Sequence, residues 1–536
     1  MKKRTDHTTG AGSAGTEATD TMGNGQQAAQ GQEAQGQAAR LAEAAGAQGQ
    51  EARLAGAAEA QGQTAQGQAE HSGPGERRRA AAGEGEGTFR QAEAIADFIS
   101  GGIEHGCGSC LGLEIEHFVV TAEGHRLVPY ADDAVTGAPG IATILERLAP
   151  YYDARIFEEQ EDGSRALIGL SRLKANVTLE PGAQLEISIG PAVRLSTLQQ
   201  LYRAFRAELD PLLAECGYVL LTLGYHPSAC AFEIPLIPKQ RYRYMDRYFQ
   251  DTGRHGICMM RATASTQVSI DFASEEDAVR KFRVATALGP LLAFITDNSP
   301  VFEGMPVGQD AGEAGGEGNV TRSGLPVPAR MAHTTVWDDV DSLRSMCAPH
   351  LFEPEFGFTD YGASLLAAPA IFTLAYDDDM RKRAIYQGTR PFSEVFSGHI
   401  LDLEKVEHIL SLFFFDVRFK TYIEIRMADS LPPEYAFAYA ALIAGIFYDE
   451  ANLSFFLTAF EGVDEDAIAR AKAALRHGAW EATVYDRPAS AWLDEMIERA
   501  RGVLSAEDQA CLQPLAELVA RRTTLLDEYR ASLHAG

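Results

Sequence analysis

Several features that mark common classes of protein are missing from this sequence of 536 residues. No run approaches eighteen consecutive apolar residues, so we expect no transmembrane helix. The basic start, Met1-Lys-Lys-Arg4, is followed by polar residues, which is not typical of a secretory signal. Acidic residues outnumber basic ones by 75 to 47, and the net charge of −28 argues against nucleic acid or an anionic membrane as a partner.

Cysteine is also scarce. The seven cysteines are odd in number and scattered, so we expect no disulfide framework and a reducing, cytoplasmic setting. Cys107-Gly-Ser-Cys110 has the spacing of a redox or metal motif, but no second CxxC accompanies it, so a zinc ribbon is not indicated. Two incidental cysteines in a turn are the default interpretation, and a redox or metal role is the alternative.

Large apolar side chains are nearly absent from residues 1–87, which consist mostly of Ala, Gln, Gly and Glu. Such a segment cannot offset the entropy of ordering, so we expect a disordered tail. The folded part is expected over residues 88–536. Its first helix would be capped by Thr88 and would end at Gly101-Gly102.

The rest of the chain mixes expected helices and strands. A helical pattern covers residues 195–216, where Pro211 predicts a kink or a break. Residues 307–324 are Gly-rich and acidic, which indicates a surface loop or a lid. From about residue 432 to the end the pattern is mostly helical. Because no βαβ repeat is present, the predicted fold class is α+β.

Residues 111–120 alternate apolar and other side chains with a period of two, which predicts a β-strand. Glu114 and Glu116 lie on one face of this strand, and Leu113 and Ile115 lie on the other. A single half-buried strand can turn its carboxylates toward water, so this strand alone does not indicate a site.

The same design recurs in three later stretches, each with a carboxylate or carboxamide on one face and apolar residues behind. They are residues 183–189 with Glu186, 263–272 with Gln267, and 421–426 with Glu424. If these strands lie side by side in one antiparallel sheet, their polar faces merge. Clustered carboxylates repel one another unless cations lie between them, and such oxygen ligands suit Mg²⁺ or Mn²⁺ together with substrate phosphates. The sequence therefore predicts an acidic, metal-binding sheet that handles a nucleotide.

Basic residues lie on or next to these strands, namely Arg261, Arg418, Lys420 and Arg426. The guanidinium fork of arginine binds two oxygens of a phosphate or carboxylate at once, which favours substrate recognition. Taken singly, each of these residues is better explained as a partner in a surface ion pair, and only their placement on the strands of the carboxylates favours substrate binding. No Walker loop, nucleophile elbow or GxGxxG follows an expected strand, so a bound nucleotide would not be held by a P-loop.

Longer motifs run in consistent order over roughly residues 90–450. They are Glu114-x-Glu116-x-Phe118, Glu180-Pro-Gly-Ala-Gln-Leu-Glu-Ile-Ser188, Ile234-Pro-Leu-Ile-Pro-Lys-Gln-Arg-Tyr242, Met259-Met260, Gln267-Val-Ser-Ile-Asp-Phe272 and Val417-Arg-Phe-Lys-Thr-Tyr-Ile-Glu-Ile-Arg426. Together they resemble the glutamate–cysteine ligases of the plant and proteobacterial type. Arg261 sits one position earlier than the corresponding arginine of that family.

The resemblance implies a fold like the glutamine synthetase catalytic core, in which a curved antiparallel β-sheet forms a funnel surrounded by helices. It also implies small-molecule substrates: ATP would drive the ligation of L-glutamate to L-cysteine and yield γ-glutamylcysteine, ADP and phosphate, with Mg²⁺ as cofactor. A related carboxylate–amine ligase with another amine, or a non-catalytic nucleotide- or metal-binding relative, are the alternatives.

The resemblance assigns roles to the polar residues of the strands. The implied metal ligands are Glu114, Glu116, Glu180, Glu186 and Glu424, and Gln267 is implied as a neutral ligand or substrate contact. Arg426 and Arg261 are implied to hold phosphate or the glutamate carboxylate. Arg418 and Lys420 are implied to bind the nucleotide phosphates.

Overall fold

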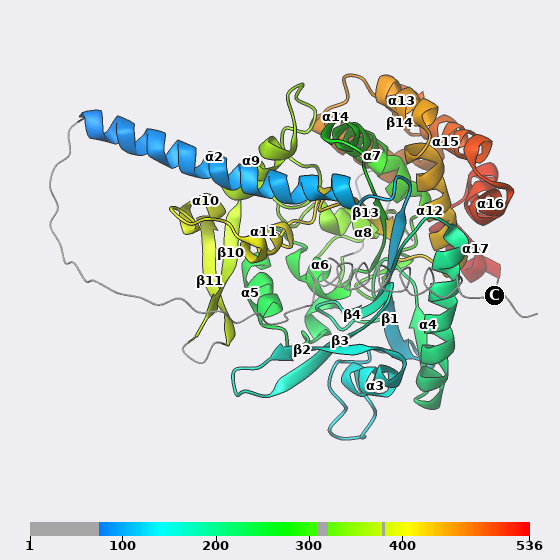
Figure 1. Cartoon of the computed structure of the whole chain (residues 1–536). Coiled ribbons are helices and arrows are strands. Elements are labelled where there is room, and N and C mark those ends of the chain that lie inside the picture. Colours follow the sequence, from blue (N-terminus) through cyan, green and yellow to red (C-terminus); the bar gives the residue numbers. More distant parts are fainter. Residues whose placement is uncertain (1–73, 309–319, 378–380, 536) are drawn as a thin grey trace, which may run out of the picture. The chain divides into compact units, whose positions relative to one another are not determined.

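The computed structural model describes residues 74–308, 320–377 and 381–535. Its central element is an antiparallel sheet of nine strands in the order β12-β13-β7-β1-β5-β4-β3-β2, with β6 paired to the far part of β1 (Figure 1). The strands are β1 (Leu111–Thr121), β2 (Ala154–Glu159), β3 (Arg165–Arg172), β4 (Ala175–Leu179), β5 (Leu185–Ala192), β6 (Tyr218–Leu221), β7 (Ser265–Ile270), β12 (Val417–Phe419) and β13 (Ile423–Asp429).

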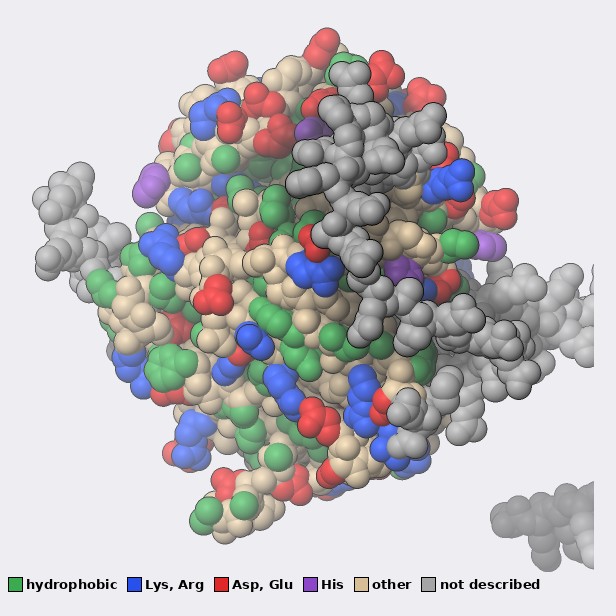
Figure 2. Space-filling view, turned by 90° about the vertical axis from the view of Figure 1, so that its left-hand side faces the viewer, with side chains coloured by type: hydrophobic (Ala, Val, Ile, Leu, Met, Phe, Trp, Pro, Cys, Tyr) green, Lys and Arg blue, Asp and Glu red, His purple; other side chains and the backbone are tan. Residues whose placement is uncertain are grey.

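Three small hairpins lie outside this sheet. They are β8 (Val301–Phe302) with β9 (Met305–Pro306), β10 (Pro369–Tyr376) with β11 (Lys382–Pro391), and β14 (Thr483–Val484) with β15 (Arg487–Pro488). The β10–β11 hairpin is the longest of them and packs against α5 (Gln240–Phe249). On the face shown in Figure 2, acidic, basic and hydrophobic side chains are intermixed where they are visible.

The four stretches with the recurring design become four neighbouring strands, β13, β7, β1 and β5. Their apolar faces are fully buried, as at Ile115, Ile187, Val268 and Ile425, each 0% exposed. Burying one such side chain contributes roughly 1.5–3 kcal/mol, and a slip of one residue would turn all of them toward the polar face. The apolar pattern therefore fixes the register, and the prediction of an α+β fold with one antiparallel sheet is confirmed.

Helices pack on the sheet and around it. Those in contact with its strands include α3 (Ile141–Leu148), α4 (Leu195–Glu215), α7 (Glu275–Ile295) and α12 (Pro433–Phe447). The others are α6 (Gly256–Ala262), α8 (Ala332–Trp337), α9 (Phe358–Ala367), α10 (Phe392–Val395), α11 (Leu403–Leu410), α13 (Glu450–Ala459), α14 (Glu465–Gly478), α15 (Ala489–Val503), α16 (Ala506–Arg521) and α17 (Leu525–Ala535). The helical C-terminal part is thus confirmed.

The first helix differs from the prediction. Helix α2 runs from Pro74 to His105, so it includes residues 74–87, which the sequence had assigned to the tail. It also continues through the glycines expected to end it. A side chain at position 102 would meet the carbonyl oxygen of Thr421 at 2.1 Å, so Gly102 serves a close approach between α2 and the chain before β13. The expected disorder of residues 1–73 lies outside the described residues.

Two other expectations have different outcomes. Helix α4 continues through Pro211 without a break, although this proline has no backbone N–H to donate to the preceding turn. Most of the expected loop or lid at residues 307–324 lies outside the described residues. No single helix of the described ranges is long and apolar enough to cross a membrane, and one bent pair, α12 with α13, reaches that length and composition only jointly.

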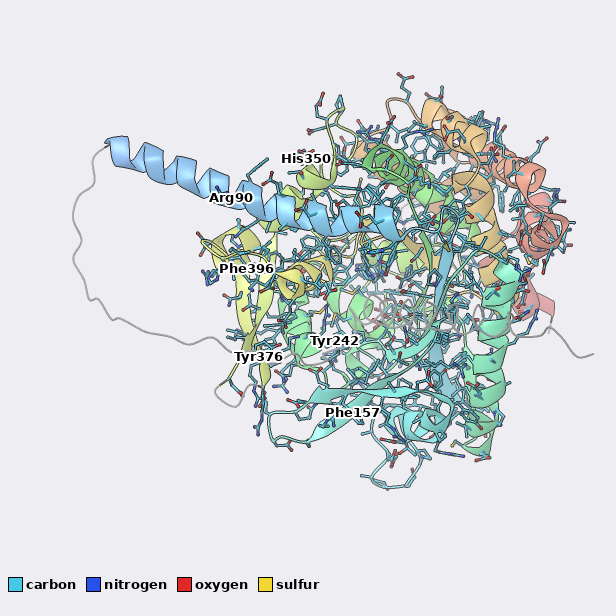
Figure 3. The ribbon with its side chains drawn as sticks, viewed as in Figure 1. Arg90, Phe157, Tyr242, His350, Tyr376 and Phe396 are labelled. Atoms are coloured by element: carbon cyan, nitrogen blue, oxygen red, sulfur yellow. A yellow bond between two sulfur atoms is a disulfide. The ribbon has the colours of Figure 1, made fainter. Side chains whose placement is uncertain are left out.

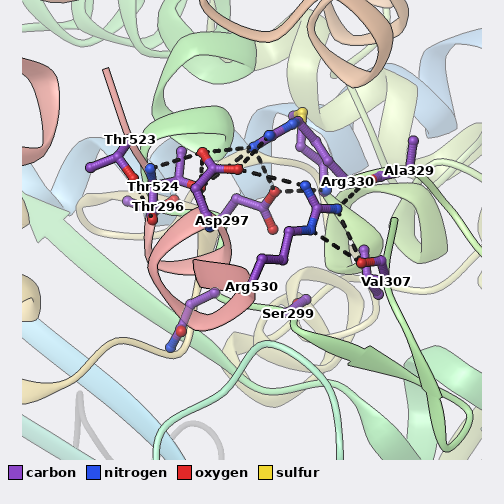
Figure 4. A network of polar contacts seen from close by, with 12 residues as sticks. Thr296, Asp297, Ser299, Val307, Ala329, Arg330, Thr523, Thr524 and Arg530 are labelled. Carbon is purple, nitrogen blue, oxygen red and sulfur yellow. Dashed lines mark hydrogen bonds and ion pairs between the residues drawn. The ribbon is translucent and has the colours of Figure 1, made fainter. Parts of the chain in front are cut away.

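The C-terminal helix α17 is tied to the chain that follows α7 by charged side chains (Figure 4). Asp527 of α17 accepts a hydrogen bond of 2.6 Å from Arg330, whose guanidinium also lies 3.8 Å from the fully buried Asp297. Arg530 donates to the carbonyl oxygen of Val307 at 3.1 Å. These contacts join α17 to the segments around Asp297, Val307 and Arg330.

Candidate active site

A cavity lies between the polar face of the sheet and the helices α5 and α6. Its acidic lining is Glu116, Glu180 and Glu186, its basic lining is Lys239, Arg241, Arg418 and Arg426, and its apolar wall includes Met245, Met259, Met260, Trp337 and Phe414. Tyr242 enters the cavity from α5 (Figure 3) and donates a hydrogen bond of 3.3 Å to the carbonyl oxygen of Leu179. Carboxylates and cations from separate strands thus converge on one space, as the sequence predicted.

The register of the sheet sets carboxylates opposite one another. Glu116 of β1 faces Glu186 of β5, and Glu114 of β1 faces Gln267 of β7. Side chains directly opposite in an antiparallel pair lie about 4.5–5.5 Å apart at Cβ, so the first two carboxyl groups share one small volume. Glu180 precedes β5 and lines the same cavity.

Glu116 is held by three donors. Its oxygens accept hydrogen bonds from the backbone N–H of Ser265 at 2.8 Å, the hydroxyl of Ser265 at 2.9 Å and the amide Nε2 of Gln267 at 2.8 Å. Burial, followed by the nearby carboxylates of Glu180 and Glu186, raises the pKa of Glu116 well above its ordinary value. These donors fix the orientation of the carboxyl group while its neighbours oppose its ionisation.

The carboxyl groups of Glu114 and Glu186 have raised pKa values, and no cation of the described residues neutralises the cluster fully. Oε2 of Glu114 is buried and has no hydrogen-bond partner in the described part of the chain. Burial, then the charges of Glu186 and Glu424, raise the pKa of Glu114 to about 8. Burial and Glu180 raise the pKa of Glu186 to about 6, although Thr178 and Ser188 donate to it at 2.8 and 3.0 Å. An unpartnered buried oxygen among crowded carboxylates fits a divalent cation with oxygen ligands.

Glu424 differs from the prediction that it is a metal ligand. Its oxygens receive Arg418, Lys420 at 2.9 Å and Arg426 at 2.7 Å, and its side chain is 0% exposed. After the opposing effect of burial, these three cations hold the pKa of Glu424 well below its ordinary value. The structure therefore makes Glu424 the shared counter-ion of three cations.

Gln267 connects the acidic and basic parts of the site. Its Oε1 accepts a hydrogen bond from Arg426, and its Nε2 donates to Glu116. Arg418, which is buried, also donates at 2.8 Å to the carbonyl oxygen of Phe413. These contacts hold the guanidinium groups of Arg418 and Arg426 in place at the cavity wall.

Arg261 does not line the cavity. Its guanidinium forms two hydrogen bonds of 2.8 Å to the carboxylate of Asp246 and donates to the carbonyl oxygen of Ile234 at 3.1 Å. The two side chains are 17% and 9% exposed, so the pair is largely buried. Asp246 on α5 occupies the fork of Arg261, which argues against the predicted role of Arg261 in holding substrate.

Sequence reasoning missed two cations of the lining. Burial, followed by the charge of Arg241, lowers the pKa of Lys239 to about 8. Arg241 donates to the carbonyl oxygen and hydroxyl of Ser411 at 2.9 and 3.2 Å. Both residues lie in the Pro-Lys-Gln-Arg-Tyr motif at the start of α5, so the motif contained the signal, but its distance from the acidic strands concealed their proximity.

Trp337 is a further lining residue that the acidic pattern could not reveal. Its Nε1–H donates a hydrogen bond of 3.0 Å to Nε2 of His333, one turn earlier in α8. This contact leaves the proton of a neutral His333 on Nδ1, which lies 3.6 Å from Oδ1 of Asp429. Burial lowers the pKa of His333 to about 3, so the ring stays neutral and keeps accepting from Trp337.

Comparison with known proteins gives consistent relatives. A family model described as glutamate-cysteine ligase family 2 matches residues 110–521. Glutamate–cysteine ligase B, chloroplastic, of Oryza sativa subsp. japonica is 32% identical over 352 residues, which cover 64% of this chain and 63% of that protein. The chloroplastic enzyme of Medicago truncatula is 30% identical over 367 residues, or 67% and 65% of the two chains. The chain thus spans less than two thirds of the length of these relatives.

Among solved structures, a glutamate–cysteine ligase of Francisella tularensis in complex with AMP covers 78% of this chain and 83% of that one. Its sequence identity is 13% and its TM-score is 0.42.

The plant relatives correct one expectation. All those compared, including that of Arabidopsis thaliana, are named chloroplastic, which points to a plastid, so the prediction of a cytoplasmic setting is wrong.

Proposed function

This chain belongs to the glutamate–cysteine ligase family 2, and we propose that it joins L-cysteine to the γ-carboxylate of L-glutamate with cleavage of ATP to ADP and phosphate. One observation carries the proposal. Four adjacent strands from distant parts of the chain bring crowded carboxylates and fixed cations to a single cavity. Activation of a carboxylate by a triphosphate requires both kinds of group within reach of each other.

The reaction divides into two steps. A carboxylate is a poor acyl donor, so the γ-phosphoryl group of ATP is first transferred to the side-chain carboxylate of glutamate. The amine of cysteine then attacks the acyl phosphate, and phosphate leaves. Both steps move negative charge between oxygens, so fixed positive groups at those oxygens lower the barrier without having to reorganise.

Arg426 and Arg418 are the proposed stabilisers of this charge. Both line the cavity and both are anchored by the buried Glu424, so their guanidinium groups are positioned before substrate arrives. Lys420 completes the anchor at 2.9 Å and is proposed to support the nucleotide phosphates. Lys239 and Arg241 face the same cavity from α5 and are proposed to hold the carboxylate of an amino-acid substrate.

Glu114, Glu116, Glu180 and Glu186 are the proposed ligands of Mg²⁺. When bound, the ion would supply neutralisation of the phosphate charge. Gln267 orients Glu116 through Nε2 and Arg426 through Oε1 and is the proposed neutral contact for substrate. The proposed catalytic domain is the part over residues 88–536, which includes all of these groups.

The test is an assay of the purified protein with ATP, Mg²⁺, glutamate and cysteine, in which phosphate release and product mass are both measured. We expect phosphate and γ-glutamylcysteine in equal amounts. Arg426→Lys, which keeps the charge but loses the fork, should lower kcat by at least tenfold. The matched control is Arg390→Lys at an exposed position of β11. Arg390 pairs with Glu394 at 2.8 Å, neither residue lines the cavity, and the change should leave kcat unchanged.

The outcomes separate the candidate functions. A different amide product with another amine would indicate a related carboxylate–amine ligase. Tight ATP binding without phosphate release across a panel of acids and amines would indicate a non-catalytic relative and would refute the proposal. Phosphate release that is unaffected by Arg426→Lys would refute the assigned role of that residue.

A further inference from the structure

A second group of metal-ligating side chains lies outside the cavity. Cys107 and Cys110 precede β1, and Asp271 follows β7 on the neighbouring strand. One ligand atom from each residue lies within 4.8 Å of the other two. In the structure the two cysteines form a disulfide, so they are close enough to act as a pair. The cavity lining contains none of the three, which makes this a separate location.

Asp271 has a buried carboxylate oxygen whose lack of a partner the disulfide does not explain. Its side chain is 8% exposed, and its Oδ1 is buried with no hydrogen-bond partner among the described residues. Its Oδ2 accepts a hydrogen bond of 3.3 Å from the backbone N–H of Cys110. A buried carboxylate oxygen without a donor is costly unless a cation or another partner reaches it.

The backbone around the three side chains is held from several sides. The hydroxyl of Tyr448 donates to the carbonyl oxygen of Cys110 and accepts from the backbone N–H of Asp271 at 3.1 Å. Lys281 donates to the carbonyl oxygen of Asp271 at 3.0 Å. A Cβ on Gly106 would lie 3.5 Å from that of Asp271, so the turn before Cys107 packs directly on this residue. The ligand atoms are therefore presented by a fixed frame.

We propose that the reduced pair Cys107 and Cys110, together with Asp271, binds one Zn²⁺ ion. Two thiolates and a carboxylate are common zinc ligands, and in a tetrahedral site they lie roughly 3.5–4 Å from one another. Cys107 is exposed and Cys110 half-buried, which leaves a path for the ion and room for water as fourth ligand. Lys281, which pairs with Asp277 at 2.9 Å, donates to the backbone of Asp271 and fixes it in place.

The disulfide and the metal-bound form exclude each other. Reduction by two molecules of an external thiol breaks the Cys107–Cys110 bond, forms the external disulfide and leaves two protein thiols. Binding of Zn²⁺ then releases these two thiol protons to solvent and forms two Zn–S bonds. The zinc site would therefore exist only in the reduced protein, and it does not depend on the proposed ligase activity.

The test uses the full chain, reduced with a phosphine under exclusion of oxygen and freed of reductant. Zn²⁺ is titrated against a chromogenic chelator in the presence of excess Mg²⁺, which occupies carboxylate sites. We expect one equivalent of tightly bound Zn²⁺ and none after oxidation of the pair. Co²⁺ in place of Zn²⁺ should give the near-ultraviolet charge-transfer absorption of cobalt–thiolate bonds.

Three variants identify the ligands. Cys107→Ser with Cys110→Ser should remove the equivalent and the absorption band. Asp271→Asn, whose amide oxygen can still accept from Cys110, should weaken Zn²⁺ binding at least tenfold while preserving the fold. The control, Cys216→Ser with Cys511→Ser, replaces two half-buried cysteines that lie elsewhere and should change nothing. Absence of Zn²⁺ binding by the reduced chain, retention in the first variant, or unchanged affinity in Asp271→Asn would each overturn the proposal.

Discussion

The affinity of the carboxylate cluster for Mg²⁺ should rise steeply with pH. A metal ligand must be ionised, yet burial and neighbouring carboxylates raise the pKa of Glu114 to about 8 and that of Glu186 to about 6. The cation must therefore displace more protons from the cluster at pH 6 than at pH 8. Binding is thus expected to be weaker on the acidic side, where most simple carboxylate sites are already fully ionised.

The size of the effect follows from these values. A carboxyl group with a pKa of about 8 is ionised in about 1% of molecules at pH 6 and in about half at pH 8, which is roughly a 50-fold change. Glu186 adds about a factor of two over the same interval. From these two groups the apparent association constant should increase by about 100-fold, which corresponds to about 2.7 kcal/mol, and the raised pKa of Glu116 should add to this increase.

Stability without the cation should move in the opposite direction. Both carboxyl groups have a higher pKa in the folded chain than in the unfolded chain, so the folded form binds more protons between the two values. Their contribution is fully present below the unfolded value near pH 4.5 and is lost as the pH rises through the folded values of about 6 and 8. Mg²⁺ should therefore raise the melting temperature more at pH 8 than at pH 6.

The assay is calorimetric titration of Mg²⁺ at pH 6, 7 and 8 in pairs of buffers with different ionisation enthalpies, which counts the protons released. Glu114→Gln should remove the roughly 50-fold share of the pH dependence that Glu114 contributes, and the remaining dependence should come from Glu186 and Glu116. Glu461→Gln, a matched change at an exposed position, should retain the full dependence. A flat affinity between pH 6 and 8, or a pH dependence that Glu114→Gln leaves unchanged, would contradict the assigned role of Glu114.

Three further predictions concern neighbouring residues. Arg261→Met leaves the carboxylate of Asp246 buried without its cation, so the free energy of unfolding measured in urea should fall by about 3 kcal/mol. The KM for glutamate should stay within twofold of the unmodified protein. Unchanged stability together with a raised KM would instead support a role of Arg261 in substrate binding. Glu424→Gln leaves three cations without their shared counter-ion and should cost about 3–5 kcal/mol in the same measurement, whereas a loss below about 1 kcal/mol would contradict the anchor. His333→Ala should release the indole of Trp337, shift its fluorescence and raise the KM for the amine. His333→Gln, which can still accept from the indole, should restore the fluorescence and the KM. Unchanged emission in His333→Ala would argue against this contact.

The parts of the fold that the sequence predicted depend on local patterns. Alternation with a period of two identified the strands around Glu114, Glu186, Gln267 and Glu424, because one apolar face had to be buried wherever those strands paired. The same reasoning placed their polar groups on one surface. Their order in the sheet could only be assumed, and the structure supplies it as β13-β7-β1-β5.

Tertiary partners limited what could be predicted about roles. Arg261 looked like a substrate clamp because nothing in its own stretch indicated that Asp246, on a separate helix, would fill its fork. Glu424 was predicted to be a metal ligand because the sequence alone did not show its three cationic partners. The pairing of β12 with β13 brings Arg418, Lys420 and Arg426 to this one carboxylate. The sequence shows which side chains could bind a metal ion or a substrate. Whether such a side chain is free to bind depends on its contacts in the folded protein.

The strands of the sheet lie far apart in the sequence, and this affects how the protein folds during its synthesis. The strands that face the cavity begin at Leu111 and end at Asp429, and β7 lies between β1 and β13 in the sheet. At about 5–20 residues per second, a ribosome needs roughly 15–65 s to produce that interval. During this time the nascent chain carries acidic strands with unpaired edges, so a chaperone that shields these edges should increase the yield of folded protein, and no contiguous fragment shorter than this interval can contain all four strands.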